Sequence, residues 1–202
     1  MTGTKGALRQ AAILDAAEEV LVAKGNAGSA MRDFAAAAGV RVGHLQHYFP
    51  TRADLIRAVL DRSLQRSLQR LKEMSGIGVG DGPGAGELLT RKHSERLLAA
   101  LLAEHSDPAG VGMHFEVWAI AAADEQIAAV VRAFYARYAE HVADLVERAR
   151  PELGEVQRNA VASTVVSLFE GAAVTRSVIG GLRADGADAE LIRTAQWLLH
   201  GI

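Results

Sequence analysis

The sequence predicts an all-α protein, and three observations support this fold class. Apolar residues recur at spacings of three and four through most of the chain, as on the buried face of a helix. The strict alternation of a half-buried strand is found nowhere. Half of the residues are hydrophobic, which is enough to bury a sizeable core.

Composition limits the classes of protein to which the chain can belong. It has 202 residues, enough for one or two domains, and no cysteine, which excludes a disulfide framework and thiolate metal sites. It lacks the apolar N-terminal segment of a signal peptide, and no uninterrupted apolar run reaches about 18 residues. We therefore expect a cytoplasmic protein with no membrane-spanning segment.

The first helix is expected over Arg9–Lys24. Ile13, Ala17 and Leu21 share one face of this helix and should pack against the elements that follow. The residues before it, Met1–Leu8, are small and polar and are expected to form a terminal arm.

The stretch Ser29–Arg52 has the pattern of two short helices separated by a tight turn. Ser29 is expected to cap the first helix with its hydroxyl. Gly39 should end that helix, because glycine adopts the left-handed conformation without a Cβ clash. The residues of the second helix that should point inward are Val42, Leu45 and Phe49. A short polar helix held out by a glycine turn is how a helix-turn-helix presents side chains to the major groove.

The same stretch carries a family resemblance. AAAAGVRVGHLQHYFPTRADL resembles the DNA-binding signature of the TetR family of one-component transcriptional regulators, and ILDAAEEVLVAKGNAGSAMRDFA resembles that family's first helix and the lead into its second. The resemblance covers Arg9–Leu60, and downstream it is a shared helical plan. Arg41 stands where a small capping residue is usual in the family, and Gln46 where a tyrosine is usual. Because both positions face DNA in that family, the resemblance predicts no operator sequence.

The distribution of charge agrees with a DNA-binding N-terminal part. Residues 1–75 contain eleven Lys and Arg against seven Asp and Glu, whereas the rest contains eleven against seventeen. A cationic segment suits a domain that meets phosphates. The residues expected to contact DNA are Arg32, Arg41, His44, Gln46, His47, Tyr48, Thr51 and Arg52.

These residues have different expected roles. Arg41, His44 and Gln46 are the expected base readers, because Arg pairs with guanine edges and Gln with adenine. The resemblance implies phosphate contacts for His47, Tyr48 and Arg52. The arm before Arg9 is either a disordered terminus or a segment that becomes ordered on DNA.

We expect the chain to consist of four parts. Residues 1–50 form the helix-turn-helix domain, 51–75 a connecting helix, 76–86 a flexible link and 87–202 a helical ligand-binding and dimerisation domain. Thr51 and Asp54 resemble a capping box at the start of the connecting helix. The link, GIGVGDGPGAG, has glycine at every second position and no G-x-G-x-x-G register, so no dinucleotide site is expected there.

Five further helices are expected, over Glu87–His105, Pro108–Ala123, Asp124–Arg150, Glu155–Gly180 and Asp188–Leu199. Small residues on the fourth of them, such as Ala160 and Thr164, would let a partner helix approach closely. The resemblance implies that the last two pair with their copies as the four-helix interface of a homodimer. A twofold dimer suits a symmetric operator.

Aromatic and polar residues on these helices suggest a mostly apolar pocket for a small-molecule effector. The candidate ligand-binding residues are Met113, His114, Trp118, Phe134, Tyr138, Phe169 and Arg176. Aromatic residues at this spacing also form ordinary cores, so both interpretations stay open. Arg176 is expected to meet an anionic ligand group, or to pair with Glu170 or with a carboxylate of a second copy.

Nothing in the sequence points to catalysis or to a bound cofactor. The histidines after residue 90 are scattered over different helices, and no H-E-x-x-H motif occurs, so no metal site is expected. No segment resembles a nucleophile elbow, and we expect no enzyme.

These features together predict a homodimeric transcriptional regulator, a repressor that a small-molecule ligand releases from a palindromic operator. One alternative is a DNA-binding regulator of the same fold that has no small-molecule inducer, or that activates. A more remote alternative is a helical ligand-binding or enzymatic bundle with an incidental helix-turn-helix. Replacing Arg41 and Gln46 distinguishes this last alternative, which predicts no loss of DNA affinity.

Overall fold

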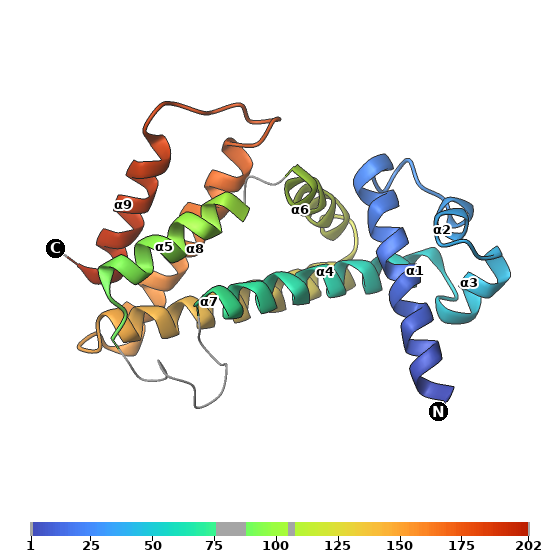
Figure 1. The fold of residues 1–202 in the computed structure, drawn as a ribbon, viewed down its shortest axis with the longest axis horizontal. Helices are drawn as coiled ribbons and strands as arrows, with labels where there is room; N and C mark the ends of the chain where they lie inside the picture. The colour runs from blue at the N-terminus through green and yellow to red at the C-terminus, as the bar shows by residue number, and fades with distance from the viewer. Residues whose placement is uncertain (1, 76–87, 105–107, 202) are drawn as a thin grey trace. The chain divides into compact units, whose positions relative to one another are not determined.

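The computed structural model describes residues 2–75, 88–104 and 108–201. All regular secondary structure in these ranges is helical, which confirms the all-α fold class (Figure 1). The chain divides into two compact units, one of residues 1–65 and 112–131 and the other of residues 66–111 and 132–202. The division falls within three helices, α4 (Arg52–Ser75), α6 (Pro108–Ala121) and α7 (Glu125–Ala149).

The first unit is built around three short-range neighbours, α1 (Thr2–Lys24), α2 (Met31–Ala37) and α3 (Val42–Tyr48). The start of α4, the part of α6 from Gly112 onward and the start of α7, up to Val131, complete it. Its fully or nearly fully buried side chains come from all of these helices: Ile13, Ala17, Leu21, Phe34, Leu45, Leu55, Ile56, Val59, Leu60, Val117 and Ile127. Truncating a large member of such a core typically costs about 3–5 kcal/mol, so these side chains fix where α2 and α3 lie.

The second unit contains α5 (Arg91–Glu104), α8 (Glu155–Thr175) and α9 (Ala187–His200). In it α9 packs against both α5 and α8 (Figure 1). Buried leucines from several segments meet in its core, and Phe169 is fully buried. Among the described residues, no helix is both long enough and apolar enough to cross a bilayer.

The first helix is longer than the sequence pattern predicted. It begins at Thr2, so the described part of Met1–Leu8 is helical rather than an irregular arm. Ala7, Leu8 and Gln10 are good helix formers, and they extend the helix beyond its buried stripe without packing of their own. Leu8 is accordingly 66% exposed. The glycine-rich link, residues 76–86, lies outside the described residues.

Two local expectations around α2 and α3 were wrong. Ser29 does not cap α2, because the helix begins one residue later, with Ala30 at the N-cap position. Ser29 is instead buried, and its hydroxyl donates to the carbonyl of Asn26. Val42 is 37% exposed rather than buried, because it lies in the first turn of α3 while Leu45 and Phe49 fill the core.

The other helix ends are set by side-chain caps and turns. Thr90 accepts a hydrogen bond from His93 N, so α5 begins at Arg91 and not at Glu87. The Asp124 carboxylate accepts from Gln126 N at 2.9 Å and thereby caps α7. The helix α8 ends at Thr175 and not at Gly180, since the chain turns there around a buried serine, Ser177.

Candidate DNA-binding interface

The turn between α2 and α3 is closed by backbone hydrogen bonds and one left-handed glycine. Gly39 has φ of +62°, which ends α2 and lets Val40 N donate back to Ala35 O at 2.9 Å. The helix that follows is anchored from beneath by Leu45, which is fully buried, and Phe49, which is 4% exposed. The outer side of α3 is therefore held away from the core.

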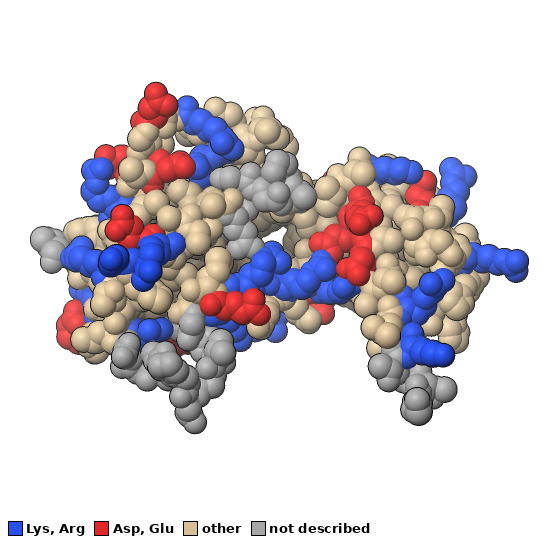
Figure 2. Space-filling view, viewed as in Figure 1, with Lys and Arg blue, Asp and Glu red and all other residues tan. Residues whose placement is uncertain are grey.

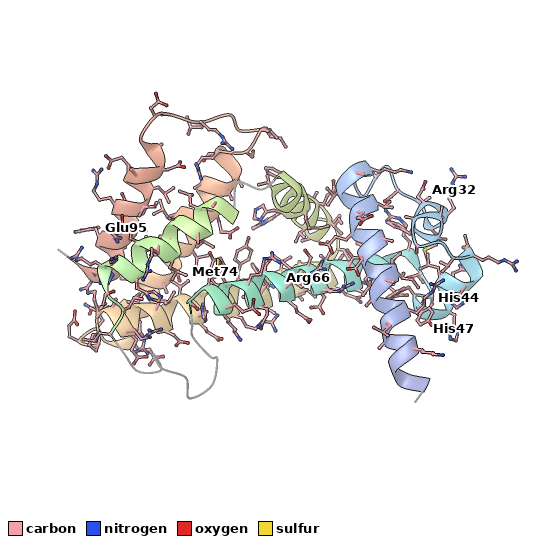
Figure 3. The ribbon with its side chains drawn as sticks, in the orientation of Figure 1. Arg32, His44, His47, Arg66, Met74 and Glu95 are labelled. Atoms are coloured by element: carbon pink, nitrogen blue, oxygen red, sulfur yellow. The ribbon has the colours of Figure 1, made fainter. Side chains whose placement is uncertain are left out.

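That outer side is polar and accessible. Arg41, His44, Gln46 and His47 are all exposed, and Tyr48 is half-buried at the edge of the helix. Figure 3 shows Arg32 on α2, and His44 and His47 on α3, at the rim of the first unit. The Tyr48 ring lies 5.4 Å from the centroid of each histidine ring in an edge-to-face arrangement. The structure thus places the predicted base readers, together with His47 and Tyr48, at the start and on the accessible part of one short helix.

The charge of α2 is arranged so that its one acidic residue is neutralised. Asp33 forms an ion pair with Lys24 at 2.8 Å and accepts a hydrogen bond from Ala30 N at 2.8 Å. The hydrogen bond from Lys24 and that from Ala30 lower the pKa of Asp33 below its ordinary value. Arg32 remains exposed beside it, and Figure 2 shows basic side chains along the outer edge of α2 and α3. Such an edge attracts phosphates.

The start of α4 is capped as the sequence predicted. Thr51 N donates to the Asp54 carboxylate at 3.0 Å, and Asp54 N donates to the Thr51 hydroxyl at 3.1 Å. The Thr51 hydroxyl also donates to Asp54, and this hydrogen bond is the main reason why the pKa of Asp54 is lowered. Thr51 is exposed, so the remaining hydrogen-bonding capacity of its hydroxyl faces solvent next to α3.

Arg52 has partners within the protein that the sequence did not predict. Its Nε donates to Ser29 O at 3.1 Å, and its Nη2 donates to the side chain of Asn26 at 2.8 Å and to the Asn26 carbonyl. Its guanidinium carbon also lies 5.9 Å from the centre of the Phe34 ring. Arg52 therefore joins the first turn of α4 to the loop between α1 and α2. A phosphate contact by this residue stays a proposal.

The candidate ligand-binding residues are distributed between the two units. Met113, His114 and Trp118 belong to the first unit, and Trp118 is 52% exposed. The residues in the second unit are Phe134, Tyr138, Phe169 and Arg176, of which the three aromatic residues are buried. The Phe134 and Tyr138 rings lie 5.9 Å apart.

Arg176 pairs with a carboxylate, but not with the one named from the sequence. Its Nη2 donates to Asp188 at 2.7 Å, whereas Glu170 accepts from the Tyr135 hydroxyl at 2.8 Å. The Nη1 atom of Arg176 is buried and has no hydrogen-bond partner in the described part of the chain. No group of three or more His, Cys, Asp or Glu among the described residues is placed to hold a metal ion.

Comparison with known proteins assigns family models to both parts of the chain. Residues 13–59 match the model described as bacterial regulatory proteins, tetR family. Residues 90–196 match the model described as BetI-type transcriptional repressor, C-terminal. Together they cover the helix-turn-helix and most of the second half of the chain.

Individual proteins give the same picture. The chain is 30% identical over 175 residues to an uncharacterized HTH-type transcriptional regulator in the dhlA 5′ region of Xanthobacter autotrophicus, covering 86% of this chain and 82% of the relative. A TetR transcription regulator from Haloarcula marismortui ATCC 43049 superposes with a TM-score of 0.76 at 17% identity, covering 97% and 98% of the two chains. A TetR-like transcriptional regulator from Rhodococcus sp. RHA1 gives 0.66 at 23% identity, with coverages of 97% and 98%. At such low sequence identities, the similarity to these two structures supports the fold alone.

Proposed function

This chain belongs to the TetR family of bacterial regulatory proteins, and from that membership we propose that it is a repressor that binds a palindromic operator as a homodimer. Regulators of this family bind operator DNA and act as dimers. The observation that carries the proposal is the exposed polar face of α3, held out on the buried Leu45. The match of residues 90–196 to a family of transcriptional repressors favours repression over activation.

The first step of the proposed function is docking of α3 in the major groove. Arg41, at the N-cap of α3, and His44 and Gln46 on its exposed side are the proposed base readers. His47, Tyr48, Thr51 and Arg32 lie around them and are proposed to hold phosphates, which sets the register of the helix on the duplex. Arg52 is proposed to contribute mainly by shaping the loop beneath this face.

The second step is pairing of two copies so that two recognition helices meet successive turns of DNA. We propose α8 and α9 as the dimer interface. The exposed residues on one face of α8 are all uncharged: Val156, Ala160, Ser163, Thr164, Ser167, Gly171, Val174 and Thr175. Trp197 on α9 is 55% exposed. An uncharged, largely small-residue face supports close helix packing, and the dimer would set the recognition helices about 34–36 Å apart.

The third step is release by a small molecule. We propose that the ligand contacts three aromatic residues of the second unit, Phe134, Tyr138 and Phe169, together with Arg176, whose buried Nη1 would donate to an anionic or carbonyl group. Such a ligand weakens DNA binding only if it binds more tightly to a dimer that no longer fits the operator.

Binding of the purified protein to DNA from its own upstream region, over a salt series, tests the proposal. We expect tight, sequence-selective binding that weakens steeply with salt, because cations on the protein displace counterions from phosphates. Equal, weak binding to every fragment would argue against an operator in that region. Absence of binding even at low salt would contradict the DNA-binding proposal itself.

Replacement of the base readers gives a residue-level prediction. Gln46→Ala and Arg41→Ala should each cost about 1–3 kcal/mol of operator binding and should reduce the preference for operator over random DNA. The measurement is fluorescence anisotropy with both duplexes at one salt concentration. Arg96→Ala is the matched control, because Arg96 is an exposed arginine on α5, outside both the recognition helix and the proposed dimer interface. Equal losses on operator and random DNA would contradict a base-reading role.

A further inference from the structure

The loop between α1 and α2 donates a hydrogen bond to a side chain on a helix far along the chain. The Glu116 carboxylate, on α6, accepts from the backbone N–H of Asn26 at 2.7 Å, across 90 positions of sequence. Both residues belong to the first unit, and both are half-buried. A charge-assisted hydrogen bond of this kind is stronger than a neutral one.

Gly25, next to Asn26, leaves room for that carboxylate. A Cβ at this position would lie 2.9 Å from Glu116 Oε1, closer than real Cβ contacts allow. Gly25 also has φ of +69°, a left-handed conformation that favours glycine. The sequence of the loop is thus adapted both to its own turn and to the approach of Glu116.

The same loop is held from its other side by α4. Arg52 donates to Asn26 Oδ1 at 2.8 Å and to Ser29 O at 3.1 Å. Asn26 consequently lies between two charged residues, with its N–H on Glu116 and its side-chain oxygen on Arg52. The ion pair between Arg57 and Asp124 at 3.6 Å also joins α4 to the turn between α6 and α7.

We propose that Glu116 is a positioning residue for DNA binding, acting through Asn26 and Arg52 on the helix-turn-helix. Since α2 begins two residues after Ser29, the placement of this loop sets how α2 lies against α4, and α3 follows through the short turn at Gly39. Base readout requires that side chains be held to within about 0.5 Å, so an unsupported loop should impair operator recognition before it impairs general attraction to phosphates. The inference rests on the proposed function, because it assigns a role within DNA binding.

Three variants test it. Glu116→Ala removes the acceptor, Glu116→Gln keeps an oxygen that can accept from Asn26, and Glu95→Ala removes an equal charge from an exposed position on α5. We expect Glu116→Ala to weaken binding to the upstream fragment roughly 10-fold at fixed salt, with affinity for random DNA and the salt dependence unchanged. Glu116→Gln should recover most of the affinity, and Glu95→Ala should behave as the wild type.

Hydrogen exchange of the Asn26 amide is a readout that does not depend on DNA. Exchange at this amide should be accelerated in Glu116→Ala and close to wild type in Glu116→Gln. Wild-type operator affinity in Glu116→Ala, or an equal loss on random DNA, would overturn the proposal. If the wild-type protein binds no DNA at all, the proposed function fails, whereas unchanged exchange at Asn26 would remove the contact on which the present inference depends.

Discussion

At Gly39 the backbone conformation itself, rather than packing, requires glycine. Its φ is +62°, and a Cβ built there would meet no atom within 4 Å. Gly39→Ala should therefore destabilise the fold by about 1–2 kcal/mol, the cost of a left-handed conformation for a residue with a Cβ. Gly43, inside α3, also faces open space but has ordinary helical geometry. Gly43→Ala should stabilise by up to about 1 kcal/mol.

Urea unfolding of the two glycine variants checks these opposite signs. The midpoints should move in opposite directions while the slope of each transition stays that of the wild type. A shift in the same direction for both variants would mean that the conformation of the turn is not the cause.

Residue-level features differ in how far the sequence could predict them. Gly39 and the Thr51–Asp54 cap depend on neighbours within a few positions, and both were predicted correctly. The partners of Arg52 depend on a loop 26 positions away, so no local pattern indicated them. Ser29 was misassigned for the same reason. Its hydroxyl has the chemistry of a cap, but the fold buries it beside Arg52.

At the scale of helices, a buried polar pair joins the end of α4 to α7. The Ser75 hydroxyl and His141 Nε2 lie 2.7 Å apart, and both residues are almost fully buried. Burial is the largest cause of a lowered pKa for His141, below its ordinary value of 6.5, and nearby Lys72 also lowers it while Asp144 opposes the shift. The folded protein therefore holds His141 neutral at a pH where the unfolded chain binds a proton.

This difference predicts loss of stability in mild acid. The unfolded chain binds more protons than the folded protein as the pH falls below about 6.5, so the free energy of unfolding should decrease there. Well above that pH, His141 is neutral in both states and should have no effect on the slope of stability against pH. His141→Gln should flatten the decrease between about pH 7 and 5.5, whatever its effect on stability at neutral pH. Thermal unfolding over a pH series measures this slope, and an unchanged slope in the variant would exclude His141 as its source.

Helices were predicted better than their ends. The periodic apolar faces located all the helices of the described chain, because burial of one face dominates the stability of each. The ends depend on single caps and on weak propensities. The helix α1 runs on through exposed residues that the apolar stripe does not reach, and α8 stops where Ser177 accepts hydrogen bonds from Ile179 N and Gly180 N.

At the scale of the whole molecule, the proposed dimer gives a prediction that separates folding from assembly. Gly171 is exposed on the uncharged face of α8, and a Cβ there would meet no atom within 4 Å of the same chain. Gly171→Arg should therefore fold at least as well as the wild type, since it removes a helical glycine. It should nevertheless be monomeric, because a buried arginine without a partner is costly at an interface.

Sedimentation equilibrium and operator binding should change together in this variant. Ala99→Arg, an equal change at an exposed position on α5, should leave both unchanged. A Gly171→Arg protein that remains dimeric would show that α8 does not form the interface.

The sequence predicted least about how distant segments of the chain are grouped. The family resemblance predicted the helix-turn-helix, since the motif over residues 29–52 is compact and specific. The grouping of Gly112–Val131 with the N-terminal helices depends on contacts such as that of Glu116 with Asn26, which join segments about half a chain apart. A single sequence contains no local signal for such a contact.

The uncharged face of α8 has a consequence for the choice of dimerisation partner. A bacterium that encodes several regulators of one fold must keep their subunits from exchanging. Interfaces with charged residues can reject a wrong partner through like-charge repulsion, but the exposed side chains from Val156 to Thr175 on this face offer no such charge. The selection of an identical subunit over a paralogous one would then depend on steric fit around Ala160 and Gly171. One added methyl group at this place on a paralogous subunit would be enough to hinder a heterodimer.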